Sequence, residues 1–86
     1  MTRDELVTGL GCPVEFITLL ETERIVIVQG DDWTPAIERV RVAWGLYEDL
    51  GVNVAGLEVV LELLERLHEE RQLHRETLRR LRSFEP

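Results

Sequence analysis

The stretch from Leu57 to Leu81 constrains this chain most, because its apolar residues recur every three or four positions along most of its length. Written as heptads with Leu57 at position a, this spacing places them in one stripe along a helix. No proline or further glycine interrupts the stretch, and Glu and Arg, which favour helices, fill most of the remaining positions. A helix of roughly 35–40 Å follows, too long for a small upstream domain to cover its whole stripe.

The distal part of the stripe therefore requires a second helix, which a second copy of the chain would supply. We expect a homodimer with a coiled-coil seam, whose middle contains the polar residues Arg71 and His74. These two side chains either extend to solvent or fix the register of the helices by pairing with glutamates of the other copy. The predicted dimerisation residues are Leu64, Leu67, Arg71, His74, Leu78 and Leu81.

The length and the cysteine content limit the class of protein. A chain of 86 residues forms one small domain with a modest core. Its single cysteine, Cys12, excludes an internal disulfide and favours a reducing compartment. The sequence has neither a basic-then-apolar N-terminal segment nor an apolar run long enough to cross a bilayer. We therefore expect a cytoplasmic protein without a membrane segment.

The charge is concentrated in the first part of the chain. Residues 1–50 contain ten Asp and Glu against four Arg, whereas residues 51–86 contain seven Glu against six Arg. Proteins that bind nucleic acid usually show an excess of basic residues, because neutralising phosphates supplies much of their affinity. The acidic N-terminal part therefore argues against nucleic acid as the partner.

The first 33 residues predict a helix-turn-helix followed by a small wing. Thr2-Arg3-Asp4-Glu5 fits a capping box, and Gly9 and Gly11 end the short helix that it opens. A second helix runs from Val14 to about Thr22. The β-branched run Ile25–Val28 predicts a strand, which a turn at residues 30–32 joins to a short return strand at Trp33.

Two further helices complete the prediction. Thr34-Pro35 opens a helix that ends near Leu50, with Gly51 as its terminator. Asn53 caps the long final helix, and residues 83–86 are expected to fray. The predicted fold is mainly α, with a winged helix-turn-helix segment and its following helix over residues 1–52 and a long helix for dimerisation over residues 53–86.

This order of elements resembles the MerR-type winged-helix family over nearly the whole chain. The resemblance rests on Asp4-Glu5-Leu6 with Gly11-Cys12-Pro13-Val14, on Glu21–Val26 and on Leu50–Leu57. Within it, the chain is most similar to the chaperone modulators CbpM, through Trp33, the Leu61-Glu62-Leu63-Leu64 run and Ser83-Phe84. Two departures are the short turn at residues 30–32 and Arg24, which stands where a glycine is usual.

The resemblance to CbpM implies a protein that binds the J-domain of a DnaJ- or CbpA-type co-chaperone and regulates its work with DnaK. J-domains as a family present a Lys- and Arg-rich helix, which acidic residues on the second helix and the wing would attract. The alternative is that these acids are ordinary solvent-exposed residues without a partner. The alternative for Phe16, Leu19 and Trp33 is that they pack in the core. The predicted partner-binding residues are Glu15, Phe16, Leu19, Glu21, Glu23, Asp31, Asp32 and Trp33.

Two other functions stay open at this stage. The first is a MerR-type DNA-binding regulator of stress or heat-shock genes, although Glu15 and Glu21 would then face phosphates. The second is an adaptor that assembles DnaK with its co-chaperone. The sequence shows no nucleophile beside a base and no metal-binding spacing, so we expect neither catalysis nor a cofactor.

Overall fold

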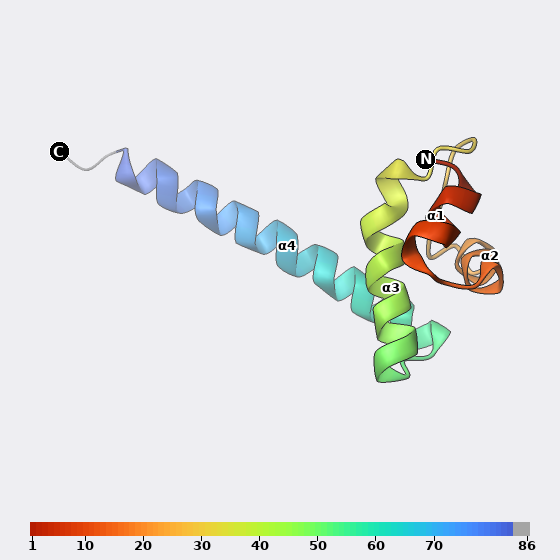
Figure 1. The fold of residues 1–86 in the computed structure, drawn as a ribbon. Coiled ribbons are helices and arrows are strands. Elements are labelled where there is room, and N and C mark those ends of the chain that lie inside the picture. Colours follow the sequence, from red (N-terminus) through yellow and green to blue (C-terminus); the bar gives the residue numbers. More distant parts are fainter. Residues whose placement is uncertain (84–86) are drawn as a thin grey trace.

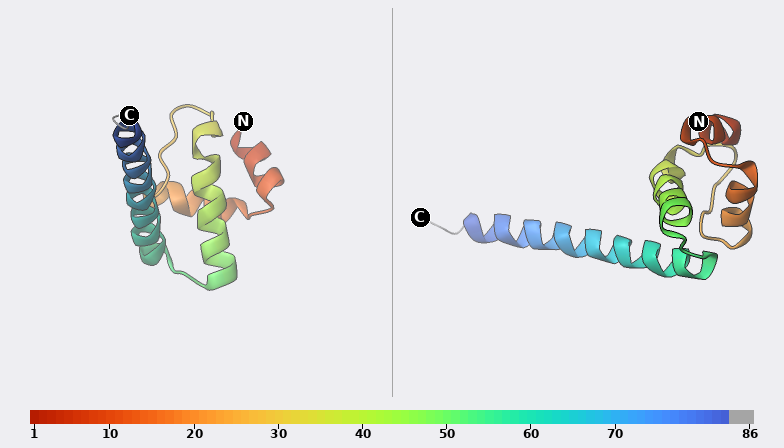
Figure 2. Two further views of the ribbon diagram at one scale, coloured as in Figure 1. Left: turned by 90° about the vertical axis from the view of Figure 1, so that its left-hand side faces the viewer. Right: turned by 60° about the horizontal axis from the view of Figure 1, so that its bottom comes forward.

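The computed structural model describes residues 1–83, and its α-helices are arranged as a small body from which one helix projects (Figure 1). The body contains α1 (Arg3–Leu10), α2 (Val14–Thr22), the short 3-10 helix η1 (Thr34–Ala36) and α3 (Ile37–Leu50). Helix α4 (Val54–Arg82) begins beside α3 and extends away from the body, as the right-hand view of Figure 2 shows. Of residues 83–86, which are expected to fray, 84–86 lie outside the described residues.

The predicted start and end of α1 are confirmed. The Thr2 hydroxyl accepts a hydrogen bond from the Glu5 backbone N–H at 3.3 Å, and the Glu5 carboxylate accepts one in return from the Thr2 N–H at 3.5 Å. Gly11 ends the helix with a φ of +68°, a left-handed conformation that glycine adopts at little cost. Pro13 then precedes α2, so α1 and α2 form the predicted helix-turn-helix pair.

The predicted two-stranded wing is wrong, because residues 1–83 contain no strand. Ile25 and Val26 are both buried, so this run does not alternate between two faces as a strand would. The backbone N–H groups of both residues bond to the Leu20 carbonyl, at 2.9 and 3.3 Å. The Trp33 N–H bonds to the Met1 carbonyl at 2.8 Å, which removes it from any pairing with the run at residues 25–28. Tertiary contacts thus override the β-propensity of this segment.

The start of α3 also differs from the prediction. The hydroxyl of Thr34 does not cap the helix; it donates to the Asp32 carboxylate at 2.7 Å. That carboxylate also accepts the Thr34 backbone N–H at 3.1 Å. The 3-10 turn η1 comes first, and α3 itself begins at Ile37. Gly51 ends α3 in a left-handed conformation, as expected.

One apolar core joins α1, α2, the loop at residues 25–33, α3 and the start of α4. It contains Leu6, Ile17, Leu20, Val40 and Leu57, each of which is fully buried. Asn53 caps α4 as predicted, since its side chain accepts the Gly56 N–H at 2.8 Å. Leu61 is the last buried residue of α4 within residues 1–83. The remaining 21 residues of the helix reach about 30 Å beyond that point, and Glu65 near their start pairs with Arg39 of the body.

Candidate partner-binding surface

The outer face of α2 follows from its helical period. Phe16, Ile17 and Leu20 point into the core, so residues between them in the helix turn outward. The exposed positions are Val14, Glu15, Thr18 and Thr22, and Glu23 follows directly after the helix. Apart from Val14, these exposed residues are acidic or small and polar. The loop at residues 24–32, which follows, contains two further acids, Asp31 and Asp32.

Two of the five predicted partner-binding acids are used inside the chain. Glu21 accepts a hydrogen bond from the Arg3 guanidinium at 2.5 Å, and the same guanidinium reaches the Thr18 hydroxyl. Asp32 accepts from the Thr34 hydroxyl and faces the N-terminal amino group at 3.3 Å. The hydrogen bonds from Thr34, together with the N-terminal charge, lower the pKa of Asp32 below its usual value. These two carboxylates hold α1, α2 and the loop together.

The other three predicted acids are available on the surface. Glu15, Glu23 and Asp31 are exposed, and none of them forms an ion pair with another residue of the described chain. We call these three residues the acidic surface. One exposed cation, Arg24, lies beside Glu23 at the end of α2. Among the exposed ionisable residues from 14 to 31, acids therefore outnumber cations three to one.

Two of the three predicted apolar anchors belong to the core instead. Phe16 is only 4% exposed and Trp33 only 2%, because α3 and the loop cover them. The Phe16 ring lies 5.0 Å from both the Trp44 and the Tyr47 rings of α3. Leu19 is half-buried. Neither Phe16 nor Trp33 can therefore contact a partner in this conformation.

Sequence reasoning did not single out the exposed apolar residue of this region, Ile27. Ile27 is 79% exposed, the highest value among the large hydrophobic residues that the structure describes. It lies in the extended part of the loop, where the predicted strand is missing. The β-branched run at residues 25–28 gave no sign of which member would face outward. An exposed β-branched side chain of this kind is a candidate apolar contact.

The backbone at Arg24 is unusual. This residue has a φ of +56°, and it is the one non-glycine position in residues 1–83 with a positive φ. It occupies the place after α2 where a glycine is common: its N–H bonds to the Glu21 carbonyl at 3.1 Å, and the next N–H bonds to Leu20. Arg24, which stands where the family usually has a glycine, therefore occupies a backbone conformation that is unfavourable for a residue with a side chain.

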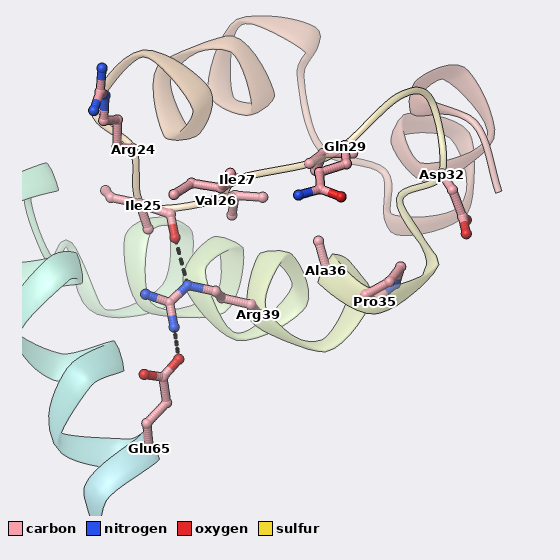
Figure 3. Close-up of a pocket in the computed structure, with 11 residues that line it drawn as sticks. Arg24, Ile25, Val26, Ile27, Gln29, Asp32, Pro35, Ala36, Arg39 and Glu65 are labelled. Carbon is pink, nitrogen blue, oxygen red and sulfur yellow. Dashed lines mark hydrogen bonds and ion pairs between the residues drawn. The ribbon is translucent and has the colours of Figure 1, made fainter.

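An open groove of about 650 Å³ lies between the loop and the two long helices. Arg39 of α3 is at its base, as Figure 3 shows, and donates through Nε to the Ile25 carbonyl at 2.6 Å. Its Nη1 also pairs with Glu65 of α4. Arg39 thus ties the loop, α3 and α4 together, a role that no sequence pattern indicated. Ile27, Pro35 and Gln29 line the same groove.

The predicted dimerisation residues lie on α4 beyond the body. The four leucines among them are 40–59% exposed, and Arg71 and His74 are exposed as well. An exposed stripe of apolar side chains of this kind is a candidate interaction surface.

Other kinds of site have little support. The Cys12 thiol is buried, and burial raises its pKa above the usual value, which suits an inert core thiol better than a reactive one. Within residues 1–83, no three His, Cys, Asp or Glu side chains gather as metal ligands would. None of the helices in that range is both long enough and apolar enough to span a membrane.

The fold defines a helix-turn-helix domain with a long projecting C-terminal helix. The family model for the MerR HTH family regulatory proteins matches residues 1–83, and the chain therefore belongs to this family. Neither the curated proteins nor the solved structures include a match to this chain.

Proposed function

We propose that this chain is a non-catalytic cytoplasmic modulator that binds the J-domain of a DnaJ- or CbpA-type co-chaperone and thereby regulates its work with DnaK. The observation that carries the proposal is the charge of the acidic surface. Glu15, Glu23 and Asp31 are exposed there, whereas Arg3 is already held by Glu21. The resemblance to the CbpM proteins supplies the identity of the partner.

Electrostatics favours a basic protein over a duplex at this face. A helix that enters the major groove needs cations near the flanking phosphates, since release of counter-ions supplies most of the affinity. Arg24 is one exposed cation against three acids, so the balance is repulsive toward DNA. The same charges attract the Lys- and Arg-rich helix of a J-domain and raise its rate of association. Ile27 would then add an apolar contact that slows dissociation.

Calorimetry with a purified J-domain tests the proposal. We expect binding that weakens as salt rises, because exposed charges are screened. The double variant Glu23→Arg with Asp31→Arg should abolish it, since two attractive contacts become repulsive. Ile27→Ser should weaken binding with little effect on its dependence on salt.

A matched control separates local charge from net charge. Glu48→Arg with Asp49→Arg makes the same change in net charge at the exposed C-terminal end of α3. We expect this variant to bind the J-domain almost as well as the original chain. Equal losses from both double variants would mean that net charge, not the acidic surface, decides binding.

The runner-up is a DNA-binding regulator of stress or heat-shock genes, which membership of the MerR HTH family favours. Fluorescence anisotropy with genomic duplexes at physiological salt distinguishes the two functions. Tight binding of a duplex that Arg24→Glu removes, without binding of the J-domain, would replace the first proposal by the second.

The active form in this proposal is a homodimer. Its seam contains Leu64, Leu67, Leu78 and Leu81 on the projecting part of α4, with Arg71 and His74 in the middle. The exposure of these leucines in the single chain supports a second helix as their cover.

A further inference from the structure

The loop between α2 and η1 contains four residues whose side chains alternate between core and solvent. Val26 is buried and Val28 packs partly against the core, whereas Ile27 and Gln29 are exposed. A period of two is the side-chain pattern of a β-strand. Figure 3 shows this part of the loop running nearly straight from Val26 to Gln29. We call residues 26–29 the extended segment, because they have the geometry of one strand without a second strand beside it.

The backbone of the extended segment has few hydrogen bonds within the chain. The N–H and C=O groups of Ile27, Val28 and Gln29 bond to no other backbone group of residues 1–83. Of the Val26 backbone groups, only the N–H is bonded in this range, to the Leu20 carbonyl. An extended backbone with unpaired donors and acceptors is an edge to which another chain can add as a strand.

There is open space beside this backbone. Val26, Ile27 and Val28 line the groove that reaches α3 and α4, and they also line a second open groove of about 310 Å³ at the end of α2. The large exposed side chain of Ile27 lies between polar neighbours, where an incoming β-branched side chain could pack on it.

Two residues with positive φ limit the length of the extended segment. Arg24 precedes it with a φ of +56°, and Gly30 follows it with a φ of +69°. A left-handed residue turns the chain out of the extended direction, so the segment spans roughly 13 Å. A strand added here is therefore short.

The two ends of the segment are marked by opposite charges. Arg24 lies near the first end and Asp31 near the second, and both are exposed. Neither forms an ion pair within residues 1–83. A complementary peptide has a carboxylate at the Arg24 end and a basic group at the Asp31 end. In antiparallel pairing, which is the slightly more stable form, the basic residue of that peptide comes first and the acidic residue last.

We propose that the extended segment binds an extended peptide of a protein partner as an antiparallel strand. The peptide has β-branched residues between a basic residue at its N-terminal end and an acidic residue at its C-terminal end. Its main chain pairs with the backbone groups of Ile27, Val28 and Gln29, and one of its side chains packs on Ile27. This contact goes beyond the function proposed above, because it does not require a J-domain as the partner.

NMR titration with two synthetic peptides of equal composition tests the proposal. The first is Arg-Thr-Val-Thr-Val-Glu, acetylated and amidated, and the second is Glu-Thr-Val-Thr-Val-Arg, blocked in the same way. The first should shift the amide signals of the extended segment and slow the solvent exchange of at least one of them roughly tenfold at saturation, because a bonded amide exchanges only after opening. The second should bind roughly threefold or more weakly, since both of its charges meet like charges in antiparallel pairing.

Two outcomes of this titration would overturn the proposal. If neither peptide shifts the amide signals of residues 26–29, the segment does not accept a strand. If the second peptide binds more tightly than the first, the strand does not lie antiparallel with the charges as assigned.

Methylation of the peptide main chain separates strand pairing from side-chain contact. Successive N–H groups of a strand point to opposite edges, so methyl groups on both valine nitrogens block one edge and methyl groups on both threonine nitrogens block the other. We expect one of these two peptides to lose binding roughly tenfold or more and the other to keep it, because only one edge faces the protein. Equal binding of both peptides, or loss of both, would contradict strand addition.

An exchange of charges in the protein tests the assigned direction. Arg24→Glu with Asp31→Arg leaves the net charge unchanged and should make the second peptide bind more tightly than the first. Glu38→Arg with Arg41→Glu exchanges an exposed ion pair on α3 and should leave the original preference in place. A preference that survives the Arg24 and Asp31 exchange would overturn the proposal, provided that circular dichroism shows an unchanged helical content.

Two further results would assign the extended segment to another occupant and replace the proposal. Slower amide exchange at Ile27, Val28 and Gln29 as protein concentration rises, without peptide, would show that a second copy pairs there. Shifts of the same amides with a genomic duplex, but with neither peptide, would show that nucleic acid contacts the loop. All of these measurements are made without a J-domain, so their failure leaves the function proposed above untouched. A chain that binds the first peptide but no J-domain would keep this inference alone.

Discussion

Arg39 and Glu65 join the two long helices of this protein at the point where α4 leaves the body. The same guanidinium donates to the Ile25 carbonyl at 2.6 Å, so one side chain fixes α4, α3 and the loop that follows α2.

We expect Arg39→Ala to lower the free energy of unfolding by about 1–3 kcal/mol, because the Ile25 carbonyl loses a charge-assisted hydrogen bond in a partly buried setting. Urea denaturation followed by circular dichroism measures this loss. Arg41→Ala is the control, since Arg41 pairs with Glu38 three residues before it on an exposed face and should matter less. Equal effects of the two variants would contradict the role assigned to Arg39.

Arg24 gives a prediction of opposite sign. Arg24→Gly should raise the free energy of unfolding by about 0.5–1 kcal/mol, because glycine adopts a φ of +56° without the steric cost that a side chain carries. Arg24→Ala retains that cost and should change stability little. Thermal and urea denaturation of both variants provide the comparison. A glycine variant less stable than the original would show that the guanidinium makes a stabilising contact.

Cys12 predicts a dependence of stability on alkaline pH. Burial raises the pKa of this thiol above its usual 9.0, so the folded chain holds the proton at a pH where the unfolded chain loses it. The stabilisation from the protonated thiol is complete below about pH 9 and declines as pH rises from there toward the higher pKa of the folded state. Urea denaturation between pH 8 and pH 10 should therefore show a steeper loss in the original chain than in Cys12→Ala. Parallel losses in the two chains would disprove the link to this thiol.

The seam of the proposed homodimer predicts the effect of two buried charges. Leu78→Asp with Leu81→Asp should give a monomer by light scattering, because carboxylates would be buried against the second helix without partners. Leu73 is exposed on the side of α4 away from the seam, so Leu73→Asp should leave the mass unchanged. A dimer that survives the double substitution would place the interface elsewhere.

Apart from the start of α3, helix boundaries were predictable because their signals are local. The Thr2–Glu5 capping box, Gly11, Gly51 and Asn53 each act through hydrogen bonds or backbone conformations that span only a few residues. The length of α4 followed in the same way from an uninterrupted helical period. Which of the predicted partner-binding acids form ion pairs within the chain was not predictable. Arg3 and Glu21, for example, are 18 residues apart in sequence.

What the sequence by itself determined is therefore the helical framework, the acidic first part and the uncovered leucines of α4. Only the tertiary structure decided the fate of the run at residues 25–28, which β-propensity assigned to a strand. The strand is absent because the backbone groups of Ile25 and Val26 form hydrogen bonds with Leu20 and Arg39 instead of with a second strand. The Trp33 N–H, which would belong to that second strand, bonds to the Met1 carbonyl. The same long-range packing turns Phe16 and Trp33 inward and leaves Ile27 outside, since which member of an apolar set is buried depends on neighbours distant in the chain.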